Sequence, residues 1–281
     1  MKIALNDLDD ESLEVEEFAK IRLKKARLKG RQTVSQLIAR QGDPEDPETR
    51  FETSDLNNLV REGYLDDLLA VIKTGKEASV YLGRAPTGLV AVKIYTDLRV
   101  RSFKRDHSYR QGRFIGDRRI ENALDHSSRF GHEVRQALWV QEEFRQMQHL
   151  REHGVRVPAA IAVSGLALLM EFIGDAAGHP APRLSDLKMD PQEAHEAFRQ
   201  SVRSLKRIVG AGRVHGDYST YNLLWQDGEA VVIDFPQVME LKHNREALTF
   251  LERDVRSLCR SFAKQGVQTD PAQVLREVRA A

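Results

Sequence analysis

The sequence predicts a two-lobed α+β fold, with a β-rich first half and a helical second half. Short β-branched and aromatic runs separated by turn residues fill residues 67–95, a pattern typical of strands. Apolar residues at helical spacing dominate two later stretches, 191–210 and 246–264. The 281 residues allow one large or two small domains, and 41% hydrophobic residues are enough to form a core.

The composition excludes several classes of protein. Lysine and arginine number 43 against 42 acidic residues, which excludes a uniformly basic nucleic-acid-binding surface. The single cysteine, Cys259, excludes a disulfide framework and favours a reducing compartment. No apolar stretch approaches the roughly 20 residues of a membrane span, and the first residues carry acids rather than a signal peptide. We therefore expect a soluble cytoplasmic protein that does not bind membranes.

Residues 1–50 are expected to form a charged helix and a linker before the compact domain. Acidic residues crowd positions 5–17 and seven basic residues follow within 20–31, as in one charged helix that ends near Gly30. Such a helix is either solvated and paired by charge with a neighbouring surface or in contact with nucleic acid. Two prolines, a glycine and four acids in residues 41–50 indicate a linker.

The predicted first lobe covers residues 51–172 and begins with three strands. These are the runs LLAVIK (68–73), SVYLG (79–83) and LVAVKIY (89–95). A polar stretch follows, and between positions 99 and 119 eight basic and two acidic residues give a local charge of +6. A long segment without periodicity inside a compact domain is usually a functional or mobile loop.

A helix at 132–152 and two buried strands within 160–174 complete the first lobe. The second lobe, residues 173–281, contains helices at 191–210 and 246–264, the first with Pro191 in its first turn. Between these helices, the loop RVHGDYSTYN precedes two short strands, LLW and AVVID.

Lys93 stands in the middle of an apolar strand. Alternation places Val90, Val92 and Ile94 on one face of the strand, and Lys93 on the other with Ala91 and Tyr95. Burying a lysine is costly unless an anion meets it, so Lys93 is a candidate phosphate ligand. Taken alone, a lysine at a strand edge is the more common explanation.

Asp217, Asn222 and Asp234 predict a phosphate and magnesium site. Asp217 and Asn222 are five residues apart in the loop HGDYSTYN, where an extended backbone can direct both towards one phosphate. Asp234 ends the apolar strand VVID, so its carboxylate emerges at the sheet edge and suits Mg²⁺. An aspartate that closes a strand is ordinary turn chemistry, but the three residues in this order are much rarer by chance.

Glu143 is the predicted partner of Lys93. A helical wheel of residues 132–152 has one apolar stripe, which contains Glu143 but not Glu142. Its apolar members are Trp139, Val140, Phe144, Met147 and Leu150. An acid on a core-facing stripe requires a nearby cation. The alternative is an edge glutamate that reaches solvent.

The segment TGKEASVY (74–81) is the candidate phosphate-covering turn. Of the glycine-rich pattern G-x-G-x-x-G-x-V it keeps the middle glycine, Gly75, and the valine, Val80, while Lys73 and Ala78 replace the other glycines. It is not a Walker A loop, because Glu77 occupies the serine or threonine position. On its own it would pass as a hairpin turn.

These motifs together resemble the RIO family of atypical protein kinases, most closely its type-one branch. The similarity spans residues 68–267 and includes TGKEASVY, VAVKIY, WVQEEFRQMQHL, LLMEFIG, HGDYSTYN, VIDFPQ and LERDVRSLCRSFAKQGV. It implies a trimmed protein-kinase-like fold that keeps the catalytic loop and lacks the peptide-docking segments. Consistently, no APE motif follows Asp234, and Pro236 replaces the glycine of DFG. The first 60 residues are too short and charged for the winged helix of the type-two branch.

The resemblance implies that ATP and Mg²⁺ are the cofactors. It makes Asp217 the catalytic residue, makes Asn222 and Asp234 the metal ligands, and makes Asp234 a candidate acyl-phosphate site as well. The implied nucleotide-binding residues are Gly75, Lys76, Val80, Lys93, Glu143, Met170, Glu171 and Ile173. Among them Lys93 pairs with Glu143 and phosphates, and Glu171 and Ile173 offer backbone groups to adenine behind Met170. The flexible loop typical of the family corresponds to about 97–131.

Two departures from ordinary kinases concern the catalytic loop. Gly216 stands where they have the arginine of HRD, so no arginine is present there to bind an activation-loop phosphate. Ser219 stands where many have a lysine on the γ-phosphate. We therefore expect slow transfer, with hydrolysis in competition.

The first functional hypothesis is an ATP- and Mg²⁺-dependent serine/threonine kinase or ATPase of RIO type, acting on a protein or on itself. By resemblance its setting is maturation of the small ribosomal subunit, with basic segment 99–119 as an RNA or ribosome contact. The second is a small-molecule (aminoglycoside-type) phosphotransferase, since these also carry HGDxxxxN. Only 47 residues follow Asp234, fewer than their larger helical lobe requires. The third is a nucleotide-gated binding module with vestigial catalysis.

Overall fold

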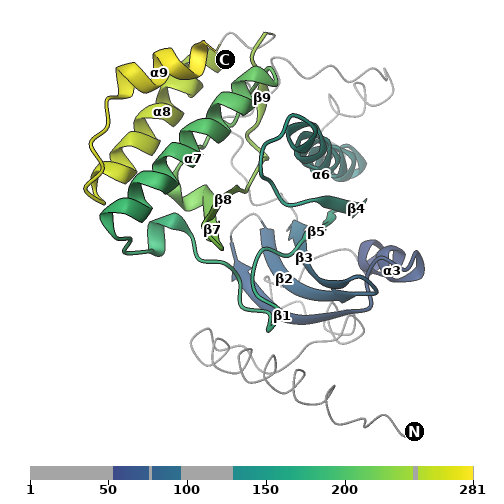
Figure 1. Cartoon of the computed structure of the whole chain (residues 1–281). Coiled ribbons are helices and arrows are strands. Elements are labelled where there is room, and N and C mark those ends of the chain that lie inside the picture. The colour runs from purple at the N-terminus through teal and green to yellow at the C-terminus, as the bar shows by residue number, and fades with distance from the viewer. Residues whose placement is uncertain (1–52, 76–77, 96–128, 243–245, 281) are drawn as a thin grey trace, which may run out of the picture. The chain divides into compact units, whose positions relative to one another are not determined.

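The computed structural model describes residues 53–75, 78–95, 129–242 and 246–280 (Figure 1). The predicted N-terminal helix and linker, Lys76 and the basic segment 99–119 lie outside these residues. The described chain forms two compact units, which we describe separately. The first lies within Met1–Val100 and Ala160–Pro180, and the second within Arg101–Ala159 and Ala181–Ala281.

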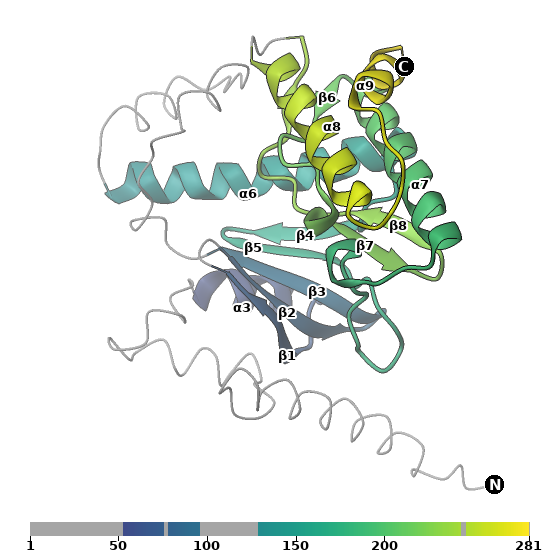
Figure 2. The ribbon, with the colours of Figure 1, turned by 90° about the vertical axis from the view of Figure 1, so that its left-hand side faces the viewer.

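The first unit is a five-stranded antiparallel sheet with one helix beside it (Figure 2). The strand order is β1-β2-β3-β5-β4, so the last two strands in sequence join the sheet at β3. The elements are α3 (Thr53–Arg61), β1 (Asp67–Thr74), β2 (Ala78–Ala85), β3 (Gly88–Tyr95), β4 (Ala160–Ser164) and β5 (Ala167–Glu171). Leu56 and Leu59 of α3 pack with Val90, Val92 and Ile94 of β3 in one core cluster, which confirms the predicted alternation.

Helix α3, which the sequence analysis did not identify, fastens the turn between β4 and β5. Its buried Asp55 accepts a hydrogen bond of 2.7 Å from the Leu166 backbone amide. Gly165, the preceding residue, has φ +49, and a Cβ there would lie 2.2 Å from Asp55 Oδ1. The turn therefore requires glycine for both its backbone conformation and the close approach of the carboxylate.

The second unit consists of helices with short strand pairs. Its helices are α6 (Arg129–Glu152), α7 (Pro191–Gly210), α8 (Ala247–Ala263) and α9 (Pro271–Arg279). Strands β6 (Arg213–Val214) and β9 (Met239–Glu240) form one ladder, and β7 (Leu223–Gln226) and β8 (Glu229–Val232) form another. Two 3-10 turns, η3 (Leu184–Asp186) and η4 (Thr220–Asn222), complete it. The predicted helix at 191–210 is confirmed to the residue, with Asp190 as its N-cap.

Helix α6 belongs to the second unit, whereas the sequence analysis placed residues 132–152 in the first lobe. Its polar contacts explain this grouping. Arg213 Nε donates to Gln146 Oε1 at 2.9 Å, and the His149 ring lies 2.9 Å from the Ala211 carbonyl oxygen. Both partners lie just after α7, so the second half of α6 is fixed to the start of the catalytic loop.

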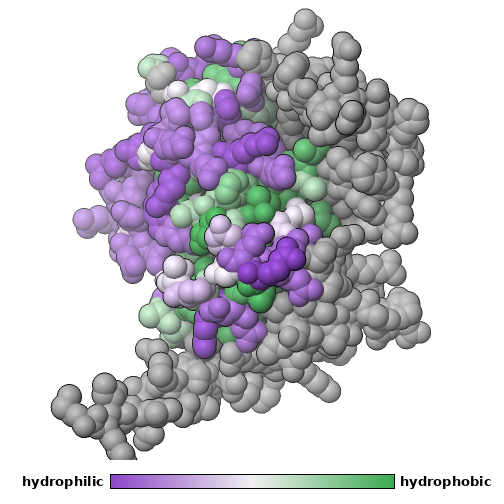
Figure 3. Space-filling model, turned by 90° about the vertical axis from the view of Figure 1, so that its right-hand side faces the viewer, coloured by the Kyte–Doolittle hydropathy of each residue, from purple (hydrophilic) through white to green (hydrophobic). Residues whose placement is uncertain are grey.

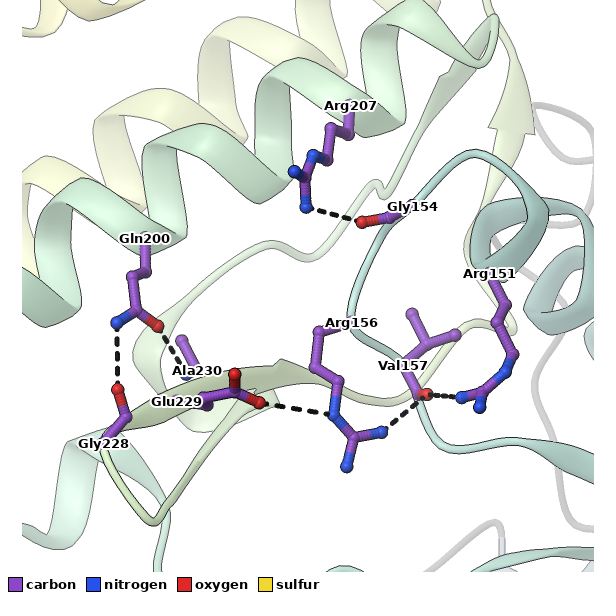
Figure 4. A network of polar contacts seen from close by, with 9 residues as sticks. All are labelled: Arg151, Gly154, Arg156, Val157, Gln200, Arg207, Gly228, Glu229 and Ala230. Atoms are coloured by element: carbon purple, nitrogen blue, oxygen red, sulfur yellow. Dashed lines mark hydrogen bonds and ion pairs between the residues drawn. The ribbon is translucent and has the colours of Figure 1, made fainter.

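A polar network joins the chain that leaves α6 to α7 and β8 (Figure 4). Arg156 pairs with Glu229 at 3.8 Å, and its backbone oxygen accepts from the Val232 amide at 2.9 Å. From α7, Gln200 donates to the Gly228 carbonyl and accepts from the Ala230 amide, both at 2.9 Å. The β7–β8 hairpin, which leads to Asp234, is therefore held from two sides.

Charged residues make up 30% of the sequence. Figure 3 shows one face, on which hydrophobic residues gather near the middle beside a largely hydrophilic area. The large hydrophobic residues exposed in the described ranges are Val60, Tyr64, Ile161, Tyr221 and Leu248. Among the described helices, none is both long and apolar enough to span a bilayer.

Candidate active site

In the first unit, β3 presents Lys93 opposite Val80. The two residues are register partners in the β2–β3 ladder, so both predicted nucleotide-binding side chains lie at one position of the sheet. Lys93 is only 8% exposed, and its Nζ lies 5.0 Å from the centre of the Tyr95 ring, on the same face of the strand. The strand therefore holds a buried cation, as the alternation predicts.

The predicted phosphate-covering turn is a tight hairpin between β1 and β2. The Gly75 amide donates to the Ala78 carbonyl at 3.0 Å, and a Cβ on Gly75 would lie 2.9 Å from that oxygen. A side chain at position 75 would therefore force the turn to open. Lys76, the next predicted residue, lies in the gap between the described ranges.

Strand β5 carries the predicted adenine-side residues. Met170 pairs with Ala91 of β3, and Glu171 pairs with Val90. Ile173 lies two residues beyond the strand and is buried. The sheet thus places Met170 and Glu171 one strand away from Lys93, in the first unit.

In the second unit, the catalytic loop brings Asp217 and Asn222 together. Asn222 Nδ2 donates to the Asp217 backbone oxygen at 2.9 Å and to Asp217 Oδ2 at 3.1 Å. Turn η4 makes this contact possible, because it shortens the span between residues that are five apart. Asn222 is buried while Asp217 is exposed. The buried asparagine therefore anchors the loop, and the carboxylate of Asp217 remains accessible.

Asp234 lies two residues beyond the end of β8, so the strand ends two residues earlier than predicted. Its φ is 70, a left-handed conformation that costs a non-glycine residue free energy and is frequent at functional sites. The Ile233 amide donates to the Asn222 carbonyl at 3.0 Å, which joins the loop of Asp234 to the catalytic loop.

Asp217 and Asp234 interact electrostatically at this site. Although Asp217 is solvent-accessible, partial desolvation raises the pKa of its carboxyl, and the charge of Asp234 raises it further, against the opposing effects of the Asn222 hydrogen bond and Arg253. A divalent cation would relieve the repulsion between the two carboxylates. Carboxylate and amide oxygens suit Mg²⁺, which usually takes one or two carboxylates and completes its shell with phosphates and water. Among the described residues, no group of three or more His, Cys, Asp or Glu side chains is placed to hold a metal.

His215 is a packing residue of the catalytic loop. Its side chain is fully buried between the rings of Tyr218 and Phe235. Burial lowers its pKa to about 4, although the charge of Asp234 opposes this effect. The imidazole is therefore neutral at pH 7, and its Nε2 lies 3.3 Å from the Ile233 carbonyl oxygen.

Glu143 faces inward on α6, as the helical wheel predicts. It is 3% exposed, whereas Glu142 is partly exposed and bonds to Gln146 on its own helix. Glu143 Oε1 accepts from the Phe235 amide at 3.3 Å. No pattern in the sequence predicts this partner, which connects α6 to the residue after Asp234.

Asp254 of α8 is a second residue that the sequence analysis missed. It is 1% exposed and accepts hydrogen bonds from the Gly216 amide at 2.8 Å and the Tyr218 amide at 3.0 Å. Burial raises its pKa to about 6, against the lowering effects of these two bonds and of Arg253. The only signal in the sequence was an acid at a core-facing position of the helix, within the motif LERDV.

We expect Asp254→Ala to destabilise the protein by about 2–4 kcal/mol, because two buried amides lose their acceptor. Asp254→Asn should cost less, since its amide oxygen still accepts from one of them. Urea unfolding at pH 7.5 measures both. Asp270→Ala is the control: it removes an ordinary N-cap from α9 and should cost about 1 kcal/mol. A loss in Asp254→Ala no larger than that of the control would contradict the assigned role.

The first unit holds an antiparallel sheet with a buried lysine, and the second holds linked loops that carry Asp217, Asn222 and Asp234. These features are typical of phosphotransferases of the protein-kinase fold class. Comparison with known proteins identifies the family within this class. The RIO domain family model matches residues 79–274, so the chain belongs to the RIO family of serine/threonine protein kinases.

Named relatives agree with this assignment. The RIO-type serine/threonine-protein kinase Rio1 of Haloferax volcanii is 40% identical over 217 residues, which cover 75% of this chain and 69% of that protein. The serine/threonine-protein kinase RIO1 of Caenorhabditis elegans is 31% identical over 249 residues, 88% of this chain but 45% of that protein. The chain thus spans less than half of this eukaryotic relative. The predicted family and kinase class are confirmed.

A solved structure confirms the predicted two-lobed α+β fold. The Rio2 kinase of Chaetomium thermophilum, in a complex described as ADP/Mg²⁺-phosphoaspartate, matches with a TM-score of 0.61 at 21% identity. The match covers 80% of this chain and 64% of that one. The relatives are named as protein kinases, so the small-molecule phosphotransferase hypothesis gains no support.

Proposed function

We propose that this protein transfers the γ-phosphoryl group of ATP, with Mg²⁺, to a serine or threonine hydroxyl of a protein or of itself. The observation that carries the proposal is the fixed pair of Asp217 and Asn222, joined through the Ile233 amide to the strained Asp234. Asp217 is exposed and orients the attacking hydroxyl. Asn222 and Asp234 supply the oxygen ligands for Mg²⁺, which neutralises charge on the phosphates.

The nucleotide is held by residues of the sheet. Lys93 contacts its phosphates and is the partner of Glu143; this pairing remains a prediction from the sequence. Gly75, Lys76 and Val80 cover the phosphates, and the backbone of Glu171 and Ile173 binds adenine behind Met170. The burial of Lys93 supports its assignment, because a buried ammonium requires an anion.

Hydrolysis of ATP competes with transfer to a hydroxyl. Ser219 occupies the position where many kinases have a lysine on the γ-phosphate, so the transferred group has one cation fewer to orient it. Asp234 is the candidate for a covalent acyl phosphate. The phosphoaspartate named in the Rio2 complex supports this assignment by family analogy.

Incubation with γ-labelled ATP, followed by hydroxylamine, tests the proposal. Labelled protein and release of inorganic phosphate are both expected, and both should vanish in Asp217→Ala. Label that hydroxylamine removes is an acyl phosphate, whereas a serine or threonine ester survives the treatment. Absence of both label and phosphate release from the unmodified protein would overturn the function and favour a binding module with vestigial catalysis.

We propose RNA of the small ribosomal subunit precursor as a partner of basic segment 99–119. Its local charge of +6 is suited to phosphate backbones. The cytoplasm is the proposed location, and the buried, free Cys259 agrees with a reducing compartment.

Replacing Arg110, Arg113, Arg118 and Arg119 with serine should weaken the salt dependence of RNA binding and leave ATP affinity unchanged. Each phosphate neutralised on a single strand contributes a slope of roughly −0.7 in log K against log salt. Binding is measured across a salt series, with the exposed α8 residues Arg256 and Arg260 changed to serine as the control. If the fourfold variant matches the parent at every salt concentration, the segment does not bind RNA, and residues 20–31 become the next candidate.

A further inference from the structure

Two neighbouring side chains of α8 hold the backbone of Gly216 from both of its polar groups. Asp254 accepts from the Gly216 amide at 2.8 Å, and Arg253 Nη2 donates to the Gly216 carbonyl oxygen. Gly216 immediately precedes Asp217. The residue before the catalytic aspartate is therefore held by α8, whose Arg253 is 37 positions further along the chain than Gly216.

Gly216 cannot itself supply an arginine to this site. Its φ is +80, and a Cβ there would lie 2.7 Å from the Gln237 carbonyl oxygen. Both the conformation and the close contact exclude a side chain. The arginine that ordinary kinases carry at this position is thus incompatible with the loop as this chain folds it.

Arg253 brings a guanidinium to the same residue from another element. The guanidinium carbon lies 4.5 Å from the centre of the Phe250 ring, one turn earlier on α8, and a cation–π contact of this kind restricts its orientation. Arg253 Nη2 binds the loop at Gly216. The residue is otherwise exposed to solvent, so its positive charge remains at the surface. That charge also acts on the Asp217 carboxylate.

We propose that Arg253 is a positioning residue for phosphoryl transfer, which acts on position 216 from α8. It holds the Gly216 carbonyl so that the Asp217 carboxylate is aimed at the acceptor hydroxyl, and it places a positive charge beside this carboxylate. This inference rests on the proposed function. The competing explanation is that Arg253 serves only as the counter-ion of buried Asp254, on which its charge also acts.

A series at position 253 separates these roles. Arg253→Lys keeps the charge and one donor, Arg253→Gln keeps a donor without charge, and Arg253→Met keeps neither. Arg256→Gln is the matched control, because Arg256 lies on the same helix, is 58% exposed and pairs with Glu252. Initial rates of phosphate release across an ATP series, and the thermal midpoint of unfolding, are measured for each variant.

We expect Arg253→Met to lower kcat by about 10- to 100-fold, because a charge-assisted hydrogen bond is lost, with the KM for ATP changed less than about threefold. Arg253→Lys should recover most of this loss, Arg253→Gln should not, and the control should keep the kcat of the parent. An Arg253→Met protein with the parent's kcat and a lowered thermal midpoint overturns the proposal in favour of the counter-ion role. If Arg253→Gln and Arg253→Lys have equal kcat values, the positive charge of Arg253 does not contribute to catalysis.

Amide hydrogen exchange distinguishes failure of this inference from failure of the proposed function. The amides of residues 216–218 should exchange faster in Arg253→Met than in the parent and the Arg256→Gln control, whether or not the protein turns over ATP. If the parent does not turn over ATP but the amides of residues 216–218 exchange faster in Arg253→Met, the proposed function is contradicted. The proposal that Arg253 holds the loop is then still supported. Unchanged exchange in these residues overturns the positioning role even in an active enzyme.

Discussion

We expect Asp217→Ala and Asp234→Ala each to reduce phosphoryl transfer by at least about 10³-fold, but to differ in their affinity for MgATP. Asp234 is the proposed ligand of the metal that bridges the phosphates, so its loss should weaken MgATP binding by about tenfold or more. Asp217 acts on the attacking hydroxyl, so Asp217→Ala should bind MgATP within about threefold of the parent. Calorimetric titration and a labelled-ATP transfer assay provide the two measurements.

Asp227→Ala provides the control for this pair. Asp227 also has a positive φ, of 50, but it lies in the β7–β8 turn. Its replacement tests whether removing any aspartate with a left-handed backbone conformation lowers activity, regardless of where the side chain lies. It should leave transfer and MgATP affinity near those of the parent. Equal losses of affinity in Asp217→Ala and Asp234→Ala would contradict the division of roles.

The second large effect is expected at Lys93. Lys93→Met should lower kcat/KM by about 10²- to 10³-fold, because the proposed phosphate contact and the proposed cationic partner of Glu143 are both removed. Glu143→Gln should cost about tenfold, since a glutamine oxygen can still accept from the Phe235 amide, as Glu143 Oε1 does. Steady-state kinetics over an ATP series measures both variants.

Glu142→Gln is the control for the glutamate. Glu142 is adjacent in sequence, but its contacts are with Gln146 and Arg145 on the same helix. Its replacement should leave kcat/KM within about twofold of the parent. If Glu142→Gln proves the more damaging of the two, the choice of Glu143 from the helical wheel is wrong.

Local periodicity in the sequence predicted most of the secondary structure. The alternation of LVAVKIY predicted β3 and the face on which Lys93 lies, because a strand reverses its side chains at every residue. The predicted helix 191–210 coincides with α7, where an N-cap, a proline and an apolar stripe coincide. Helices α3 and α9 were missed, because each has only nine residues and offers too few turns for a periodic signal.

The sequence by itself determined the kinds of residue at the site and their order: a strand lysine, an inward-facing glutamate, an aspartate and asparagine five apart, and an aspartate after an apolar strand. These are local features, readable within a single element or loop. The tertiary structure alone decided how they are held. Asp234 adopts a left-handed backbone conformation that no local pattern predicts. Arg253 and Asp254 bind the backbone of Gly216 and Tyr218 through hydrogen bonds between residues 36 to 38 positions apart, a separation that has no periodic signal in the sequence. Their energies come from buried hydrogen bonds that exist only once α8 has packed against the loop.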